Sequence, residues 1–167
     1  MPTTKLVKLV YLIDYSYFEH YGETLTGFQY MWDHHGPNAL SHAIKAEAEL
    51  LAERGMVRIL HKPNIYDSVT TEFSLADGVQ MGRLDSGAEM VVSDILHLYG
   101  HYSVKRITAL SKKTKPFRNA NQYDPLVFDQ SAPVERGEPG DWEAHRSEIE
   151  ELGTTSQEEI MAEYGLN

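Results

Sequence analysis

Asp33, His34 and His35 stand next to one another, and they are the side chains whose types could most directly support metal chemistry. A carboxylate and two imidazoles can hold a divalent cation, and the bound cation can activate a water molecule for hydrolysis. Consecutive residues of an extended chain point to opposite sides, however, and no separate group of Asp or Glu residues completes the set. We therefore expect these residues to have structural roles and predict no metal site here.

His97 and His101 form a second group, because a spacing of four residues places two imidazoles on one face of a helix, with Asp94 one turn earlier. Gly100 interrupts that helix, and no glutamate of the HExxH type lies between the histidines. We expect a solvated or capping arrangement at a helix end. A metal-dependent hydrolase built on the histidines of both groups stays open as a third hypothesis, after the two given below.

Other catalytic signatures are absent from the sequence. It contains no GxxxxGK[ST] phosphate loop, no GxGxxG fingerprint, no GxSxG nucleophile elbow and no cysteine. The first residues, MPTTKLVKLVYLID, lack the uncharged apolar core of a signal peptide, and no apolar run approaches the roughly 18 residues that a membrane span requires. The sequence therefore predicts a cytoplasmic protein that is not an enzyme, uses no cofactor and has no membrane partner.

The negative charge of the chain is concentrated at its C-terminal end. The formal net charge is −10, and residues 134–167 alone carry ten acidic and two basic residues. The preceding residues are close to neutral, whereas binding to a phosphate backbone depends on clustered Lys and Arg. A partner protein with a basic surface is therefore expected, and nucleic acid is not.

One cluster of basic residues nevertheless follows residue 104. Its members are Lys105, Arg106, Lys112, Lys113, Lys115 and Arg118. Most such clusters are solvated helix ends, but some contact nucleic acid and others bind an acidic protein segment. The acidic C-terminal tail of the same molecule is one candidate for that segment.

Two elements are predicted before Asp33: a central, mostly buried helix, and an aromatic strand that follows it. Apolar residues recur at helical spacing and leave a narrow polar stripe of Lys5, Lys8, Ser16 and Glu19. Gly22 is expected to end this helix, because glycine adopts the left-handed conformation without strain. Phe28, Tyr30 and Trp32 then alternate with other side chains as in a strand, which Gly36 and Pro37 break.

The remaining elements are predicted from periodicity and capping residues. They are a helix over residues 37–54, a β-hairpin whose strands lie near 57–60 and 69–75, a helix over 87–99 with a capping box at Ser86 and Glu89, and a helix capped by Ser103, with Pro116 ending either that helix or the loop after it. The aromatic strand is a possible third partner of the hairpin. The predicted fold class is mainly α, as an α+β fold: a compact helical domain with a small antiparallel β-hairpin or wing, followed by an acidic helical tail.

Residues 1–130 are predicted to form this domain, and residues 131–167 a linker and an acidic amphipathic tail. SAPVERGEPG has the Pro, Gly and charge content of a linker. The short helices expected after it are marginal alone in water and need a surface to dock on, either the body of the protein or another chain. The apolar side chains that would anchor the tail on such a surface are Trp142, Ile149, Leu152, Ile160, Met161 and Tyr164.

Several short motifs, taken in order, resemble the Panacea antitoxin domain, also called the SocA-like domain. They are KLVKLVYLID, then Tyr21-Gly22-Glu23, then an aromatic strand that ends in His35-Gly36-Pro37, and finally Leu110-Ser111, Thr114, Pro116-Phe117 and Ala120, which are similar to the family ending LS..T.PW..A. Phe117 stands where that ending has tryptophan. The positions that match the family motif are Lys5, Tyr11, Asp14, Tyr30, Trp32, Gly36 and Pro37.

The resemblance implies a mostly helical domain that serves as the antitoxin of a bacterial or phage toxin–antitoxin pair and neutralises a cognate protein toxin. The toxins of such pairs include alarmone-synthetase-like enzymes that block translation, and some relatives deliver the toxin to a protease as adaptors. Most motif positions are expected to be structural. Asp14 in particular must meet a hydrogen-bond donor, because an unpaired buried carboxylate is costly.

Two hypotheses therefore lead. The first is an antitoxin that sequesters its toxin by direct contact. Such a protein is expected to form a hetero-oligomer with the toxin or a homo-oligomer of its own. The second is a winged-helix-like DNA-binding regulator, which the hairpin after a helix suggests and the near-neutral body disfavours.

Overall fold

The computed structural model describes residues 1–63, 69–80 and 82–129 of the 167-residue chain. The linker, the acidic tail and its six expected anchor residues lie outside this part.

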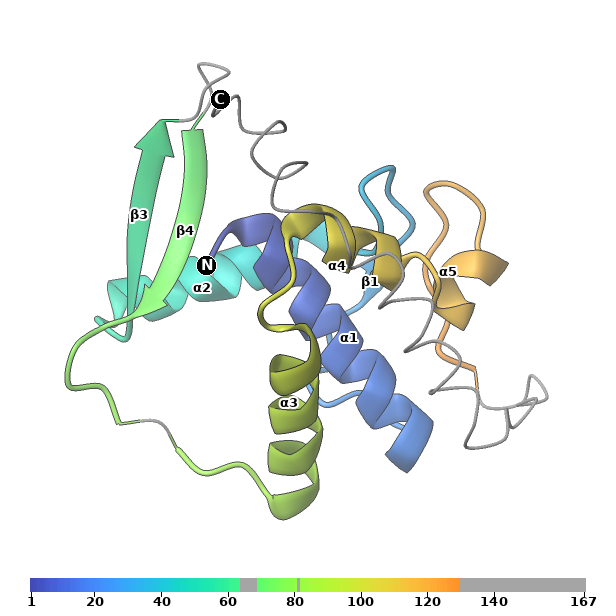
Figure 1. The fold of residues 1–167 in the computed structure, drawn as a ribbon, viewed down its shortest axis with the longest axis horizontal. Coiled ribbons are helices and arrows are strands. Elements are labelled where there is room, and N and C mark those ends of the chain that lie inside the picture. The colour runs from blue at the N-terminus through green and yellow to red at the C-terminus, as the bar shows by residue number, and fades with distance from the viewer. Residues whose placement is uncertain (64–68, 81, 130–167) are drawn as a thin grey trace, which may run out of the picture. The chain divides into compact units, whose positions relative to one another are not determined.

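The helix α1 (Thr3–Tyr21) is the central element, as predicted (Figure 1). It contacts α3 and α4, and its buried side chains include Leu9, Tyr11 and Phe18. Gly22 ends the helix with a φ of 79°, and its N–H donates to the Phe18 carbonyl. One expectation was wrong: Lys8 does not lie on a polar stripe but is buried, since only 2% of it is exposed.

The predicted aromatic strand is shorter than expected and belongs to a different sheet. β1 (Tyr30–Met31) pairs in antiparallel fashion with β2 (Asn38–Ala39), so it is not a third strand of the later hairpin. The other edge of β1 is covered by the chain near residue 125, because Trp32 N donates to the Asp124 carbonyl over 2.8 Å. The strand is short because a tight turn after Trp32 reverses the chain.

The helix predicted over residues 37–54 begins six residues later than expected. A short 3-10 helix (Leu40–His42) precedes α2 (Ala43–Glu53). Proline at the start of a helix is compatible with helical geometry, but here the residues after Pro37 pair with β1. Ser41 and His42 then take a φ of 54°, which lies outside the helical region. The expected end at Gly55 is confirmed, since this residue follows α2 with a φ of 71°.

The predicted β-hairpin is present as β3 (Val57–Pro63) and β4 (Val69–Leu75), with Ile59 opposite Phe73. β3 continues through His61 and Lys62, beyond the predicted end of this strand near residue 60. The chain before α1 runs along the free side of β4, because Phe73 N donates to the Met1 carbonyl and Thr3 Oγ1 donates to the Thr71 carbonyl. The hairpin is thereby tied to the start of α1.

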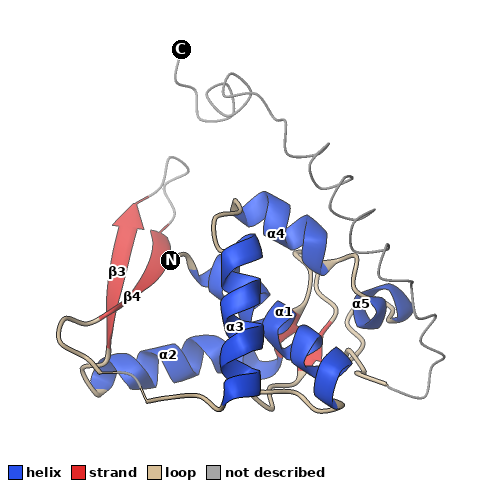
Figure 2. Cartoon of the chain, turned by 60° about the horizontal axis from the view of Figure 1, so that its bottom comes forward, coloured by secondary structure: helices blue, strands red, loops and turns tan. Residues whose placement is uncertain are grey.

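Three helices complete the described part of the chain: α3 (Ser86–Tyr99), α4 (Val104–Ser111) and α5 (Lys115–Asn119) (Figure 2). Ser103 caps α4 as predicted. The expected capping box at Ser86 was wrong, because the Asp85 side chain accepts from the N–H groups of Gly87 and Ala88. Of the two possibilities for Pro116, the second holds: the loop after α4 ends there, and Pro116 lies in the first turn of α5, which tolerates proline. The fold is thus a mixture of helices and small antiparallel sheets, as predicted.

Candidate functional site

The turn from Asp33 to Pro37 is the centre of the candidate site, and hydrogen bonds to the Asp33 side chain stabilise it. Asp33 accepts hydrogen bonds from His35 N over 3.1 Å and from Asn38 Nδ2 over 3.2 Å, and Gly36 N donates to the Asp33 carbonyl. The hydrogen bond from His35 N lowers the pKa of the Asp33 carboxyl most, burial opposes it, and the bond from Asn38 lowers the pKa further. The Asp33 carboxylate thus stabilises the turn by accepting these hydrogen bonds.

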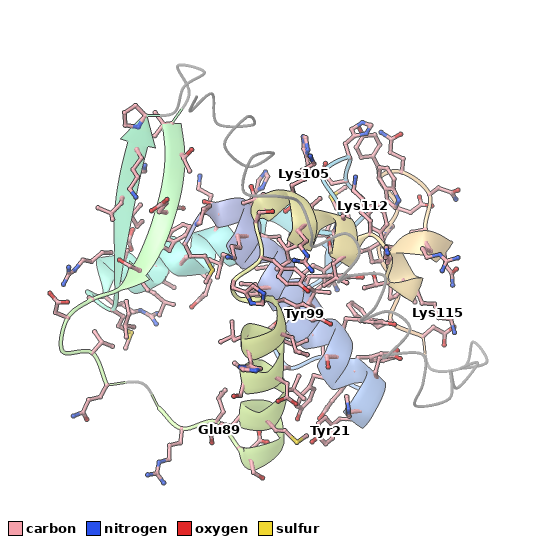
Figure 3. The ribbon with its side chains drawn as sticks, in the orientation of Figure 1. Tyr21, Glu89, Tyr99, Lys105, Lys112 and Lys115 are labelled. Atoms are coloured by element: carbon pink, nitrogen blue, oxygen red, sulfur yellow. The ribbon has the colours of Figure 1, made fainter. Side chains whose placement is uncertain are left out.

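Two lysines hold this turn from α1 and α4. Lys8 Nζ donates to the Pro37 carbonyl over 2.6 Å, and Lys112 Nζ donates to the His34 carbonyl over 2.6 Å. Figure 3 labels Lys112, the residue that follows the last turn of α4. Burial lowers the pKa of Lys8 to about 8, the charge of Asp33 opposes this shift, and the charge of Lys112 adds to it. The carbonyls at both ends of the turn therefore have cationic donors.

Gly36 allows this close approach. Its φ is 86°, and a Cβ atom built on it would lie 3.1 Å from Ser111 Oγ and 3.4 Å from Lys8 Cε. Both the left-handed backbone and the tight contact favour glycine here. The motif positions Gly36 and Pro37 thus set a turn, as expected.

Aromatic and polar side chains from two loops meet at the surface of the turn. Trp32 stacks on Phe117 with ring centroids 4.9 Å apart, and the His34 ring stands edge-on to Trp32. His34 Nε2 lies 2.6 Å from Gln122 Nε2 and 3.2 Å from Tyr123 Oη. We call the set of Trp32, His34, Gln122 and Tyr123 the tip surface.

A buried polar network lies beneath, and it supplies the donors that Asp14 was expected to need. Asp14 is fully buried and accepts hydrogen bonds from Thr26 N over 2.8 Å, from Thr26 Oγ1 and from Tyr30 Oη over 2.6 Å. Burial raises the pKa of Tyr30, and the nearby charge of Asp14 raises it further. Tyr30 therefore remains a hydroxyl donor across the ordinary pH range.

A second buried pair joins α1 to the chain after α4. Tyr11 Oη and Thr114 Oγ1 are 2.5 Å apart, and Thr114 Oγ1 donates to the Ser111 carbonyl over 2.9 Å. Because the Thr114 proton is used in that bond, Tyr11 is the donor to Thr114. Burial raises the pKa of Tyr11, partly opposed by the bond to Thr114.

Six of the seven motif positions therefore meet around one region: Asp14 and Tyr30 in the buried network, Tyr11 in the second buried pair with its ring against Tyr30, Trp32 at the surface, and Gly36 and Pro37 in the turn. The seventh, Lys5, lies half-buried on α1 and is not part of these groups.

The histidines considered as metal ligands are not brought together. His97 lies in the last turn of α3, whereas His101 follows the end of this helix, and both are exposed. Within the described residues, no three His, Asp or Glu side chains form a group that could hold a metal ion. Nor does any helix in the same part of the chain have the length and apolar character that crossing a bilayer requires.

The predicted basic cluster is spread along α4 and α5. Figure 3 shows Lys105, Lys112 and Lys115 at successive positions along these helices. The Arg106 guanidinium lies 3.8 Å from the centre of the Tyr102 ring, a cation–π geometry. Lys112 serves the turn, so part of this basic character has a local structural use.

Sequence reasoning missed several residues of the site. Lys8 was assigned to a polar stripe, but its place between two apolar rows of α1 could have suggested burial. His34 was weighed as a metal ligand and assigned a structural role, but not a place on the protein surface beside Gln122 and Tyr123. Gln122 and Tyr123 gave no signal, because their position beside His34 depends on a contact between residues almost 90 positions apart.

Comparison with known proteins gives one match. The profile of a family described as "Antitoxin SocA-like, Panacea domain" matches residues 6–117. This range includes six of the seven motif positions and ends at Phe117, on which Trp32 stacks. No curated protein and no solved structure matches the chain.

Proposed function

Because the chain belongs to the SocA-like Panacea antitoxin family, we propose that it neutralises a cognate protein toxin by binding that toxin directly. The family match over residues 6–117 is the observation that carries this proposal. An antitoxin role is regulatory and calls for a partner protein. The toxin, in this proposal, is one that blocks translation, in the manner of an alarmone synthetase.

The arrangement of the motif residues supports a binding role. The polar side chains of Asp14, Tyr30 and Tyr11 are buried and satisfied by hydrogen bonds inside the protein, so they are not presented to a substrate. What they do is hold a loop rigidly, and rigid scaffolds that present loops are typical of binding proteins. The exposed part of the region consists of aromatic and amide side chains, which are common in protein contacts.

The acidic C-terminal segment contributes a second contact in this proposal. Residues 134–167 carry the excess negative charge, which would attract a basic surface of the toxin and speed its association. The apolar anchors are Trp142, Ile149, Leu152, Ile160, Met161 and Tyr164.

Co-expression with the product of the neighbouring gene tests the proposal. We expect that product alone to stop growth, and this chain to restore growth and to co-purify with it. The amount of toxin should be unchanged during rescue, because sequestration does not remove it; a loss of toxin that depends on a cellular protease would indicate an adaptor instead. A neighbouring product that is harmless by itself would contradict the antitoxin role.

The tail contact has its own test in the full-length chain. Trp142→Ala should weaken rescue, because a large aromatic anchor is lost. Glu143→Ala, which changes the adjacent polar residue, is the matched control and should have a smaller effect. Equal rescue by both variants and by the unchanged chain would argue against the tail contact.

A further inference from the structure

We propose that the tip surface binds an acidic segment of the cognate toxin, with Tyr123 as the aromatic anchor and Arg118 as the main electrostatic contact. This inference rests on the proposed function and goes beyond it by naming a surface of the body and the chemistry of its partner. It is independent of the contact proposed for residues 134–167.

Tyr123 is held in an unusual and exposed position. Its φ is 69°, in the left-handed region that residues other than glycine, asparagine and aspartate seldom adopt, and 59% of the residue is exposed. Its N–H donates to the Trp32 carbonyl, and Asn121 and Asp124 bind one another on either side. Conformations of this kind persist where the surroundings impose them, and they are concentrated at binding sites.

The ring of Tyr123 is also fixed by its neighbours. It stands edge-on to His34 at a centroid distance of 5.8 Å, and its hydroxyl lies 3.2 Å from His34 Nε2. The main chain of His34 accepts a hydrogen bond from Lys112, and its ring contacts Gln122 and Trp32. An exposed aromatic ring that already packs against a neighbour loses less conformational entropy on binding than a free side chain, which suits an interface anchor.

The packing of the rings favours a protein partner over nucleic acid. One face of Trp32 is stacked on Phe117, and His34 approaches the same ring at an angle of 75°. Stacking of successive bases needs open aromatic faces, whereas one face of Trp32 is already covered and the rest of the tip surface adds an imidazole, an amide and a phenol. Contacts of this mixed kind are typical of protein interfaces.

The charge around the tip surface selects the class of partner. The stretch from residue 111 to 123 contains Lys112, Lys113, Lys115 and Arg118 and no acidic residue. Asp33, which lies between Trp32 and His34 in the sequence, and Asp124, which follows Tyr123, accept hydrogen bonds from N–H groups of nearby residues. Arg118 is exposed at the last turn of α5, so a carboxylate-bearing segment of the toxin is the complementary partner.

The test measures the affinity of the full-length chain for the purified product of the neighbouring gene by titration calorimetry. Tyr123→Asn removes the ring but keeps a residue that tolerates positive φ, so the loop should stay folded. We expect it to raise Kd about tenfold or more. Arg118→Glu should raise Kd about threefold or more in low salt, with the difference shrinking as salt is added.

Matched controls separate the surface from general effects. Tyr21→Asn removes another exposed tyrosine, which Figure 3 shows at the end of α1 beside the start of α3, and should leave Kd within about twofold. Arg83→Glu makes the same charge change in the loop before α3 and should also leave Kd within about twofold. Thermal melting of each variant confirms that it is folded.

The outcomes distinguish the two proposals. If the unchanged chain does not bind the neighbouring product, the proposed function fails for that partner, and the inference about its surface falls with it. If the unchanged chain binds and the Tyr123 and Arg118 variants bind equally well, the antitoxin role stands and the tip surface is not the contact. Binding of a labelled single-stranded RNA 20-mer that is lost in Tyr123→Asn would overturn the choice of a protein partner.

Discussion

At the scale of single residues, Asp14 shows why a carboxylate can sit on the buried face of the central helix. All its described partners are donors: Thr26 N, Thr26 Oγ1 and Tyr30 Oη. A buried charge is tolerated when it is hydrogen-bonded, because these bonds replace its lost hydration. The side chain therefore ties the loop after α1 and the strand β1 back onto α1.

Replacement of this carboxylate should destabilise the fold through the donors it leaves behind. Asp14→Ala leaves the buried Tyr30 hydroxyl without its acceptor, and we expect a loss of about 2–4 kcal/mol in the free energy of unfolding. Tyr30→Phe in the Asp14→Ala background should cost little more, since the unsatisfied donor is then gone. Urea denaturation of the four proteins measures this coupling; additive losses would contradict it.

Lys8 is the second residue with a pronounced effect of burial. Its pKa falls to about 8 from the usual 10.5 of a lysine, chiefly because the protein removes its charge from water. Between these two pH values the unfolded chain binds the proton more readily than the folded one. The contribution of Lys8 to the unfolding free energy must therefore rise with pH in this window.

This sign predicts a stability that increases from about pH 8 to about pH 10, by roughly 2 kcal/mol from Lys8 alone. Above pH 10 the trend reverses, because the raised pKa values of Tyr11 and Tyr30 make the unfolded state release protons first. Lys8→Met should remove the rise, whereas Lys112→Met, the other lysine bound to the turn, should keep it. Denaturation series at several pH values measure both; a rise that survives in Lys8→Met contradicts the assignment.

At the scale of elements, the turn between β1 and β2 depends on a backbone conformation and on close packing together. Gly36 and Gly55 have similar positive φ values, 86° and 71°, and each follows or forms a sharp reversal of the chain. They differ in their surroundings, since a Cβ at Gly36 would press on Ser111 and Lys8, while a Cβ at Gly55 would meet nothing within 4 Å.

The pair of glycines separates these two causes. Gly55→Ala should cost about 1 kcal/mol, the usual strain of alanine in the left-handed region. Gly36→Ala adds the contact with Ser111 Oγ and should cost about 2–3 kcal/mol. Thermal or urea unfolding measures the difference, and equal losses would mean that the close contact is relieved without cost.

At the scale of the whole molecule, the matched residues 6–117 do not complete their own core. The chain after them runs back along β1, and Phe128 places its ring 5.5–6.3 Å from the rings of four residues: Tyr11, Tyr15, Phe18 and Tyr30. Leu126 N also donates to the Tyr30 carbonyl. The segment that follows the family match thus covers the aromatic side of α1.

Phe128→Ala should therefore destabilise the protein by about 2–3 kcal/mol, although the residue lies beyond the matched range. Val127→Ala is the matched control, because Val127 is the residue next to Phe128 and is 67% exposed. This substitution should change stability by less than about 0.5 kcal/mol. Chemical unfolding of both variants measures this, and a small loss in Phe128→Ala would show that the segment is only loosely attached.

The sequence by itself determined the elements whose signals are local. The long apolar periodicity of α1, the glycine at its end, the alternation in β3 and β4 and the cap of α4 were predicted correctly, because each depends on residues a few positions apart. The order of short motifs also indicated the family that the profile match shows.

Only the tertiary structure decided which residues meet. The start of α2 was misplaced because the pairing of Asn38 and Ala39 with β1 overrides a local preference for helix after proline. Lys8 became a buried donor, and His34 joined Tyr123, through contacts between residues 29 and 89 positions apart. Burial and hydrogen bonding of this kind depend on which surfaces the folded chain brings together, and the spacing of residues along the chain does not specify that.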